Sequence, residues 1–146
     1  MFRYSRLHKE TASLVVVFVD PRRTTDEFKQ MIEAFNRLPV GPMGIAVAVV
    51  NTDDKNEHRK LLKKNPSIKM PVLSDPSKKL VDIMMCRGSK RLESVLFILE
   101  VKTCSIINIW YEGDIDAITT KDLIVDEITK YRKNPAQYVK TNKSLK

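Results

Sequence analysis

Hydrophobic residues along this chain fall into short unbroken runs, separated by segments in which they recur with a helical period. Leu14–Val19 (LVVVFV) and residues 44–50 (GIAVAVV) are continuous apolar runs, typical of strands that are buried on both faces. Between them, one apolar stripe at helical spacing is formed by Phe28, Met31, Ile32, Phe35 and Leu38. The pattern predicts a strand–helix–strand unit with a right-handed crossover.

Polar residues mark where two helices begin. Thr24 followed by Glu27 matches a capping box, which predicts that Thr24 caps the first helix. Asp54 followed by Glu57 predicts the start of a second helix, which runs to Lys64. We expect its outer face to be strongly basic, with His58, Arg59, Lys60, Lys63 and Lys64 exposed and with Leu61 and Leu62 turned inward.

The second half of the chain predicts a short strand, a helix, a hairpin and a last helix. Residues 70–74 form the short apolar run, and Asp75-Pro76 reads as the start of a helix that closes near Gly88. Two apolar runs, 95–99 and 106–111, are close enough to form a β-hairpin. The last helix begins at Thr119 or Thr120. We therefore expect an N-terminal arm (1–12), one α/β domain (13–135) and a basic tail (136–146).

Composition favours an intracellular globular protein from a reducing compartment. Hydrophobic residues make up 42% of the 146 positions and charged residues 30%, and no apolar run is long enough to span a membrane. The two cysteines, Cys86 and Cys104, form no CxxC pair, and such sparse usage suits a reducing compartment. The spacing of His, Cys and acidic residues predicts no metal site, and the few glycines predict no nucleotide cradle, so we expect no cofactor.

The net charge of +8 favours anionic partners, although a solvated lysine surface explains it equally well. Three segments concentrate the charge. They supply the candidate binding residues Arg59, Lys60, Lys63 and Lys64, then Arg87, Lys90 and Arg91, then Lys130, Arg132 and Lys133. Arg22 and Arg23 in the turn after the first strand add a possible docking face for acidic groups. These surfaces suit protein partners or nucleic acid, and their spacing matches no specific RNA-binding module.

Three segments resemble the peroxiredoxin branch of the thioredoxin-like proteins. Pro21-x-x-x-Thr25-x-x-Phe28 is similar to the family's Pro-x-x-x-Thr-x-x-Cys loop. Residues 70–76 (MPVLSDP) resemble its hydrophobic-Leu-Ser-Asp segment, and residues 96–110 resemble its hairpin. The resemblance implies a thioredoxin-like three-layer α/β/α sandwich, with a mixed central sheet and a C-terminal hairpin and helix.

The sequence differs from the family pattern at two positions that matter for catalysis. The resemblance places the peroxide-reactive cysteine at Phe28, which has no nucleophile. It places the family's peroxide-binding arginine at Ser94, with Lys90 and Arg91 nearby as possible replacements. The degenerate site is therefore Pro21, Thr25, Phe28 and Ser94.

Three functions stay open at this point. The first is a non-catalytic binding or structural subunit of a larger assembly. The second is an atypical thiol redox protein that uses Cys86 or Cys104, and the third is an RNA- or ribosome-associated accessory protein.

Overall fold

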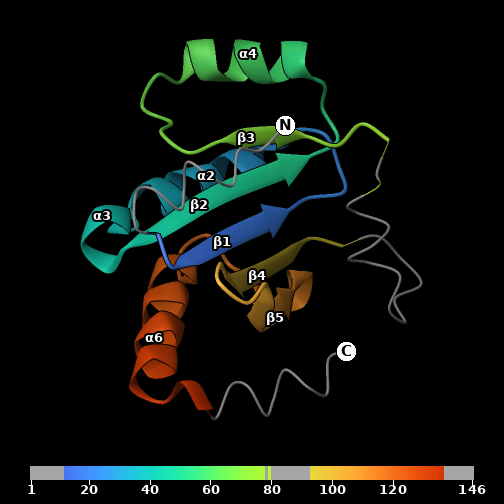
Figure 1. The fold of residues 1–146 in the computed structure, drawn as a ribbon. Coiled ribbons are helices and arrows are strands. Elements are labelled where there is room, and N and C mark those ends of the chain that lie inside the picture. Colours follow the sequence, from blue (N-terminus) through green and yellow to red (C-terminus); the bar gives the residue numbers. More distant parts are fainter. Residues whose placement is uncertain (1–11, 78, 80–92, 137–146) are drawn as a thin grey trace.

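The computed structural model describes residues 12–77, 79 and 93–136 (Figure 1). Several expectations from the sequence fall outside these residues. They concern the N-terminal arm, most of the helix expected after Asp75, the basic loop with Cys86, Arg87, Lys90 and Arg91, and the basic tail from residue 137.

A five-stranded mixed sheet forms the centre of the fold, in the order β3-β2-β1-β4-β5. Its strands are β1 (Leu14–Val19), β2 (Ile45–Asn51), β3 (Val72–Ser74), β4 (Val95–Glu100) and β5 (Ser105–Tyr111). The first three are parallel, and β4 runs antiparallel to both β1 and β5. The carboxyl ends of the parallel strands therefore meet the start of β4 and the end of β5 at one edge of the sheet.

The described helices that pack on the sheet cover one of its faces. The helical segments are α2 (Asp26–Asn36), the short α3 (Val40–Met43), α4 (Lys55–Lys64), the 3-10 turn η1 (Glu112–Asp114) and α6 (Thr120–Lys133). Phe28 of α2, Leu61 of α4 and Ile124 of α6 belong to one buried cluster, together with Val16 and Val49 of the sheet. Figure 1 shows α4 as the outermost of these helices, beside the edge strand β3.

A second buried cluster lies on the opposite face of the sheet, formed by Val19, Val50, Val95 and Phe97. Successive side chains of a strand point to opposite faces, so β1 contributes to both clusters. Burial on both faces explains why the apolar runs are unbroken. The mixed α/β arrangement predicted from the sequence is confirmed, with a C-terminal hairpin and helix.

The predicted capping of the first helix is wrong by one residue. Thr25, rather than Thr24, is the N-cap of α2, and its hydroxyl accepts a hydrogen bond from the Phe28 amide at 3.1 Å. Thr24 instead contacts Asn51, the last residue of β2, and Asp53 just after it, which local sequence does not reveal. Asp54 caps α4 as predicted and accepts from the Glu57 amide at 2.9 Å.

The predicted faces of α4 are partly wrong. His58 was expected on the exposed basic face but is buried, with 4% exposure. Leu62 was expected to be inward but is exposed, and Leu61 alone of the two leucines packs into the core. The imidazole is buried because polar partners lie beneath it on β2 and β3, as described below. Polar contacts of this kind decide which face of a ten-residue helix is buried as much as its apolar residues do.

Candidate functional site

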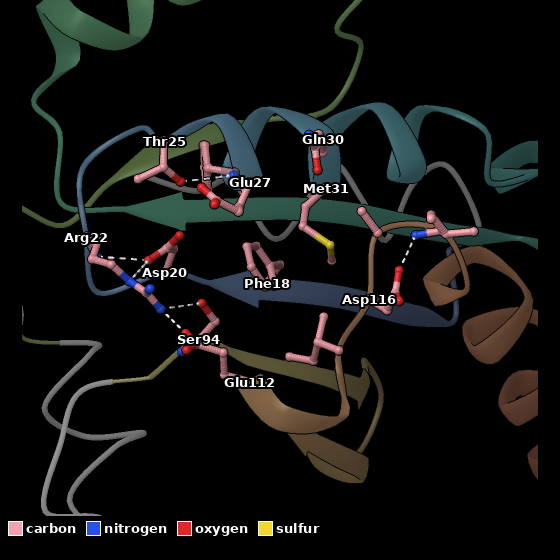
Figure 2. Close-up of a pocket in the computed structure, with 14 residues that line it drawn as sticks. Phe18, Asp20, Arg22, Thr25, Glu27, Gln30, Met31, Ser94, Glu112 and Asp116 are labelled. Carbon is pink, nitrogen blue, oxygen red and sulfur yellow. Dashed lines mark hydrogen bonds and ion pairs between the residues drawn. The ribbon is translucent and has the colours of Figure 1, made fainter.

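A cleft of about 460 Å³ lies at the carboxyl end of β1. Its walls come from the loop that links β1 to α2, the first turns of α2, the start of β4 and the segment that follows β5 (Figure 2). Strand order alone brings these segments together, because β1 lies next to β4 and β4 lies next to β5. This edge of an α/β sheet is where ligand sites commonly form.

Asp20 is the first residue of the cleft after β1. Its amide donates to the Val50 carbonyl at 2.8 Å, which continues the pairing with β2 for one more residue. Its carboxylate is 3% exposed and accepts hydrogen bonds from the Arg22 amide at 3.0 Å and from Arg22 Nε at 3.1 Å. Burial raises the pKa of Asp20 above its ordinary value, although the hydrogen bonds and positive charge of Arg22 oppose this rise.

Arg22 connects the loop to the hairpin. Its Nη2 donates to Ser94 Oγ at 3.2 Å and pairs with the Glu112 carboxylate, which also accepts from the Ser94 amide at 3.1 Å. Figure 2 shows the guanidinium lying between Asp20 and the Ser94–Glu112 pair. We call these four residues the Arg22 clamp. It joins the loop to the start of β4 and the end of β5.

Thr25 and Phe28 line the cleft from the N-terminal end of α2. Thr25 is half-buried at the N-terminus of α2, whereas the Phe28 side chain is completely buried. Its ring lies 6.1 Å from the ring of Phe18, which in turn lies 5.8 Å from that of Phe35. Phe28 is therefore part of an aromatic cluster in the main core.

The described residues that line the cleft give it an acidic character. They include four carboxylates, Asp20, Glu27, Glu112 and Asp116, against one cation, Arg22. Since Arg22 is engaged by Asp20 and Glu112, the carboxylates of the cleft are not balanced by positive charge. Ile118, at its rim, is 87% exposed.

A second group of buried and half-buried polar residues holds the other side of the same loop. Asn51 Nδ2 donates to Thr24 Oγ1 at 2.9 Å, and the Thr24 amide donates to Asp53 Oδ2 at 2.9 Å. Asn51 Oδ1 lies 2.5 Å from His58 Nε2, and His58 Nδ1 lies 3.0 Å from Ser74 Oγ. We call these five residues the Asn51 network.

The hydrogen bonds of the Asn51 network define the state of the imidazole. Asn51 Oδ1 is an acceptor, because its amide nitrogen donates to Thr24, so His58 Nε2 carries a proton and donates to it. His58 Nδ1 then accepts from the Ser74 hydroxyl. Burial lowers the pKa of His58, and the charges of Asp53 and Asp54 only partly oppose this effect. The neutral imidazole links α4 to β2 and β3.

Comparison with solved structures identifies the fold. The chain matches the PrxQ protein of Xylella fastidiosa with a TM-score of 0.71 and 18% identity, over 86% of this chain and 82% of that one. It matches peroxiredoxin Q of Xanthomonas campestris with a TM-score of 0.69 and 15% identity, over 85% and 82% of the two chains. It matches the peroxidoxin BcpB of Mycobacterium tuberculosis with a TM-score of 0.68 and 15% identity, over 85% of this chain and 84% of that one.

The protein has a peroxiredoxin-like thioredoxin fold. No protein-family model matches the sequence, and no curated protein is similar to it. The likeness is therefore one of fold, and the predicted fold class is confirmed. Within this fold, the cleft lies where the sequence resemblance places a reactive site, at the junction of β1 and α2.

The structure brings together three of the four residues of the expected degenerate site. Thr25, Phe28 and Ser94 line the cleft, and Pro21 is buried in the same loop. The guanidinium beside Ser94 comes from Arg22, whereas the sequence suggested Lys90 or Arg91, which lie outside the described residues. Arg23 is 86% exposed and lies 3.8 Å from Asp53.

The remaining candidate cations lie far from the cleft along the chain, on two helices. Those of α4 are exposed, and so are those of α6: Arg59, Lys60, Lys63, Lys64, Lys130, Arg132 and Lys133. Lys130 pairs with Asp126 at 3.1 Å, and Arg132 donates to Ser13 Oγ at 3.0 Å. Arg87 and Cys86 lie outside the described residues.

Cys104 is exposed in the turn between β4 and β5, with a left-handed backbone (φ 58°). The cleft is formed at the other end of this hairpin, by Ser94 and Glu112. Six strand residues separate the two ends, which at about 3.3 Å per residue is roughly 20 Å. Cys104 therefore lies far from the cleft.

Sequence reasoning missed the Arg22 clamp and the Asn51 network. The residue pairs of the clamp lie up to 90 positions apart, so no local motif contains them. Across the described ranges, no group of three or more His, Cys, Asp or Glu residues is arranged to hold a metal ion. In the same residues no helix is long and apolar enough to cross a membrane.

Proposed function

We propose that this protein is a non-catalytic binding or structural subunit, built on a peroxiredoxin-like thioredoxin fold and assembled with protein partners. One observation carries the proposal. Phe28, the residue that the sequence resemblance aligns with the peroxide-reactive cysteine, has 0% exposure and packs in the aromatic cluster of the core. A phenyl ring cannot attack a peroxide, and a fully buried side chain cannot meet a substrate.

The charge of the cleft supports the same conclusion. A reactive cysteine needs a positive environment, because the thiolate rather than the thiol is the nucleophile. Here the described cleft residues carry four carboxylates and one arginine, and that arginine is engaged by Asp20 and Glu112. Such a cleft disfavours a thiolate.

The position of Cys104 argues against its use at this site. The cysteine lies at the turn of the hairpin, and the cleft lies at the opposite end of the same hairpin. The one hydrogen bond that its thiol makes among the described residues is to the Val101 carbonyl within the same turn, at 3.9 Å. Thiol chemistry at the cleft would therefore have to come from Cys86.

A peroxidase assay tests the absence of catalysis. The full chain is supplied with hydrogen peroxide or an alkyl hydroperoxide and with dithiothreitol as reductant, next to its C86S, C104S and C86S/C104S variants. We expect the same slow loss of peroxide from all four proteins. A rate that is several-fold higher in the unaltered protein, and that is lost in C86S or C104S, would overturn the proposal in favour of a thiol enzyme.

Capture of the tagged protein from its own cells, with and without nuclease, tests the second half of the proposal. We expect a set of proteins in fixed stoichiometry that survives nuclease treatment. Elution of the native protein as a free monomer would contradict a role as a subunit. Because this readout needs no peroxide, the two halves of the proposal can fail separately.

A further inference from the structure

Helix α4 presents a dense array of positive charge to solvent. Its ten residues include five cations, Lys55, Arg59, Lys60, Lys63 and Lys64, and one acidic residue, Glu57. All five cations are exposed. In the described structure one of them, Lys60, forms an ion pair within the helix, with Glu57 at 3.3 Å.

Three of these cations form a line along the helix. Lys55, Arg59 and Lys63 follow one another at intervals of four residues, which at 1.5 Å per residue places them about 6 Å apart. We call them the α4 cation row. Like charges at this interval destabilise a helix, so the row opposes the stability of α4. Lys63 lies in the last turn, where the helix dipole favours a cation, but this effect does not explain Lys55 or Arg59.

Buried residues hold the opposite side of α4 firmly. Leu61 packs into the main core, and His58 bonds to Asn51 and Ser74 beneath it. Asp54 closes the N-terminus of the helix. The outward direction of the cation row is thus fixed by the core before any partner binds, which lowers the entropic loss on binding.

The chemistry of this face selects among anionic partners. A membrane-surface helix needs a free apolar face to insert, but the apolar face of α4 is used by the core and Leu62 is its one exposed large hydrophobic residue. A protein interface needs an apolar or aromatic centre, in which charged residues are depleted. Binding to a phosphate backbone needs little besides correctly placed cations.

We infer that the α4 cation row binds the phosphate backbone of a nucleic acid, without reading its bases. This activity goes beyond the proposed role as a subunit and does not depend on it. The row contains no aromatic side chain on which bases could stack, so we expect its contacts to be mainly with phosphates. Affinity should therefore depend steeply on salt and weakly on sequence.

Fluorescence anisotropy with a short labelled oligouridylate tests the inference on the full chain. For a single strand, each neutralised phosphate adds about −0.7 to the slope of log K against log salt. Three contacts then predict that affinity falls by about 20-fold between about 50 and 200 mM KCl. The variant K55Q/R59Q/K63Q should bind more weakly at low salt, and its slope should be shallower by about two.

A matched variant on α6, K121Q/K130Q/K133Q, removes the same charge from a different helix. We expect it to keep the slope of the unaltered protein and most of its affinity. Equal losses in the two variants would mean that net charge alone attracts RNA, and would overturn the inference. An unchanged slope in the α4 variant would overturn it as well.

Two further measurements complete the test. Vesicles that contain phosphatidylserine replace RNA in a parallel titration, and binding to vesicles that depends on the row, without binding to RNA, would assign the surface to membranes and overturn the inference. Thermal unfolding by circular dichroism checks that both variants fold. Since the α4 substitutions are exposed and remove repulsion, we expect no decrease in melting temperature.

Discussion

The substitution Phe28→Ala tests whether Phe28 is a residue of the core or a movable side chain that covers the cleft. Phe28 lines the cleft, but its side chain has 0% exposure and its ring packs near Phe18. A side chain that only covers a cleft loses few packing contacts when it is truncated to alanine. A core residue gives up its burial and leaves a cavity behind.

The expected loss is large. Truncation of a buried phenylalanine to alanine lowers the free energy of unfolding by about 3–5 kcal/mol. For 146 residues, an unfolding entropy of about 2.1 cal/mol/K per residue gives a total of about 0.3 kcal/mol/K. The melting temperature should therefore fall by about 10–16 °C.

Urea unfolding followed by the fluorescence of Trp110 measures this loss directly. Trp110 is the single tryptophan, lies on β5 and packs against the core cluster that contains Phe28. The midpoint should move to lower urea at unchanged slope, because the surface exposed on unfolding hardly changes. Ile118→Ala is the control, since this side chain lies at the rim of the same cleft and is 87% exposed. It should change stability by less than about 0.5 kcal/mol.

A loss below about 1 kcal/mol in Phe28→Ala would refute this reasoning. It would mean that the neighbouring side chains refill the space at little cost, or that Phe28 leaves the core in solution. In the second case the cleft would be deeper than the structure shows. The main argument against catalysis at this site would then be lost.

Three further substitutions test the networks around the cleft. Arg22→Met should lower stability by about 1–3 kcal/mol in urea unfolding, because the buried Asp20 carboxylate loses its charged partner. Adding Asp20→Asn to the same chain should recover part of that loss, because the buried group is then uncharged. Burial lowers the pKa of His58, so on acidification the imidazole is protonated in the unfolded chain before it is protonated in the folded one, and stability should fall as the pH drops below 6.5. In urea unfolding repeated at several pH values, His58→Gln should not show this loss of stability at low pH. Cys104→Gly should raise the melting temperature in calorimetry, since residue 104 has a φ of 58°, and a decrease would show that the thiol itself stabilises the turn.

The regular elements could be predicted from the sequence because their signals are local. Strand β1 was predicted with its observed bounds, Leu14–Val19, and the cap of α4 at Asp54 was correct. The unbroken apolar runs correctly indicated strands buried on both faces. In these cases the residues that decide the structure lie within a few positions of one another.

The site could be predicted only in part, because long-range contacts decide it. The resemblance brought Thr25, Phe28 and Ser94 to one place. Arg22 is exposed, as expected for a docking residue, but its pairing with Glu112 follows only from strand order. His58 looked like one more basic residue of α4. Its burial depends on Asn51 at the end of β2, which becomes a partner only once β2 and α4 are packed together.

The two polar networks act on one loop from opposite sides. Arg22 connects the loop to the hairpin, while the nearby Thr24 connects it to Asn51 at the end of β2 and to Asp53 just after that strand. Buried polar groups are expensive unless all of them are bonded, and each buried side-chain polar atom of the described residues has a partner. A loop that carried only a turn would not need so many buried polar partners. This loop sets the position of α2 and, through His58, that of α4. A rigid loop without a nucleophile suits a protein whose surfaces, rather than whose cleft, meet its partners.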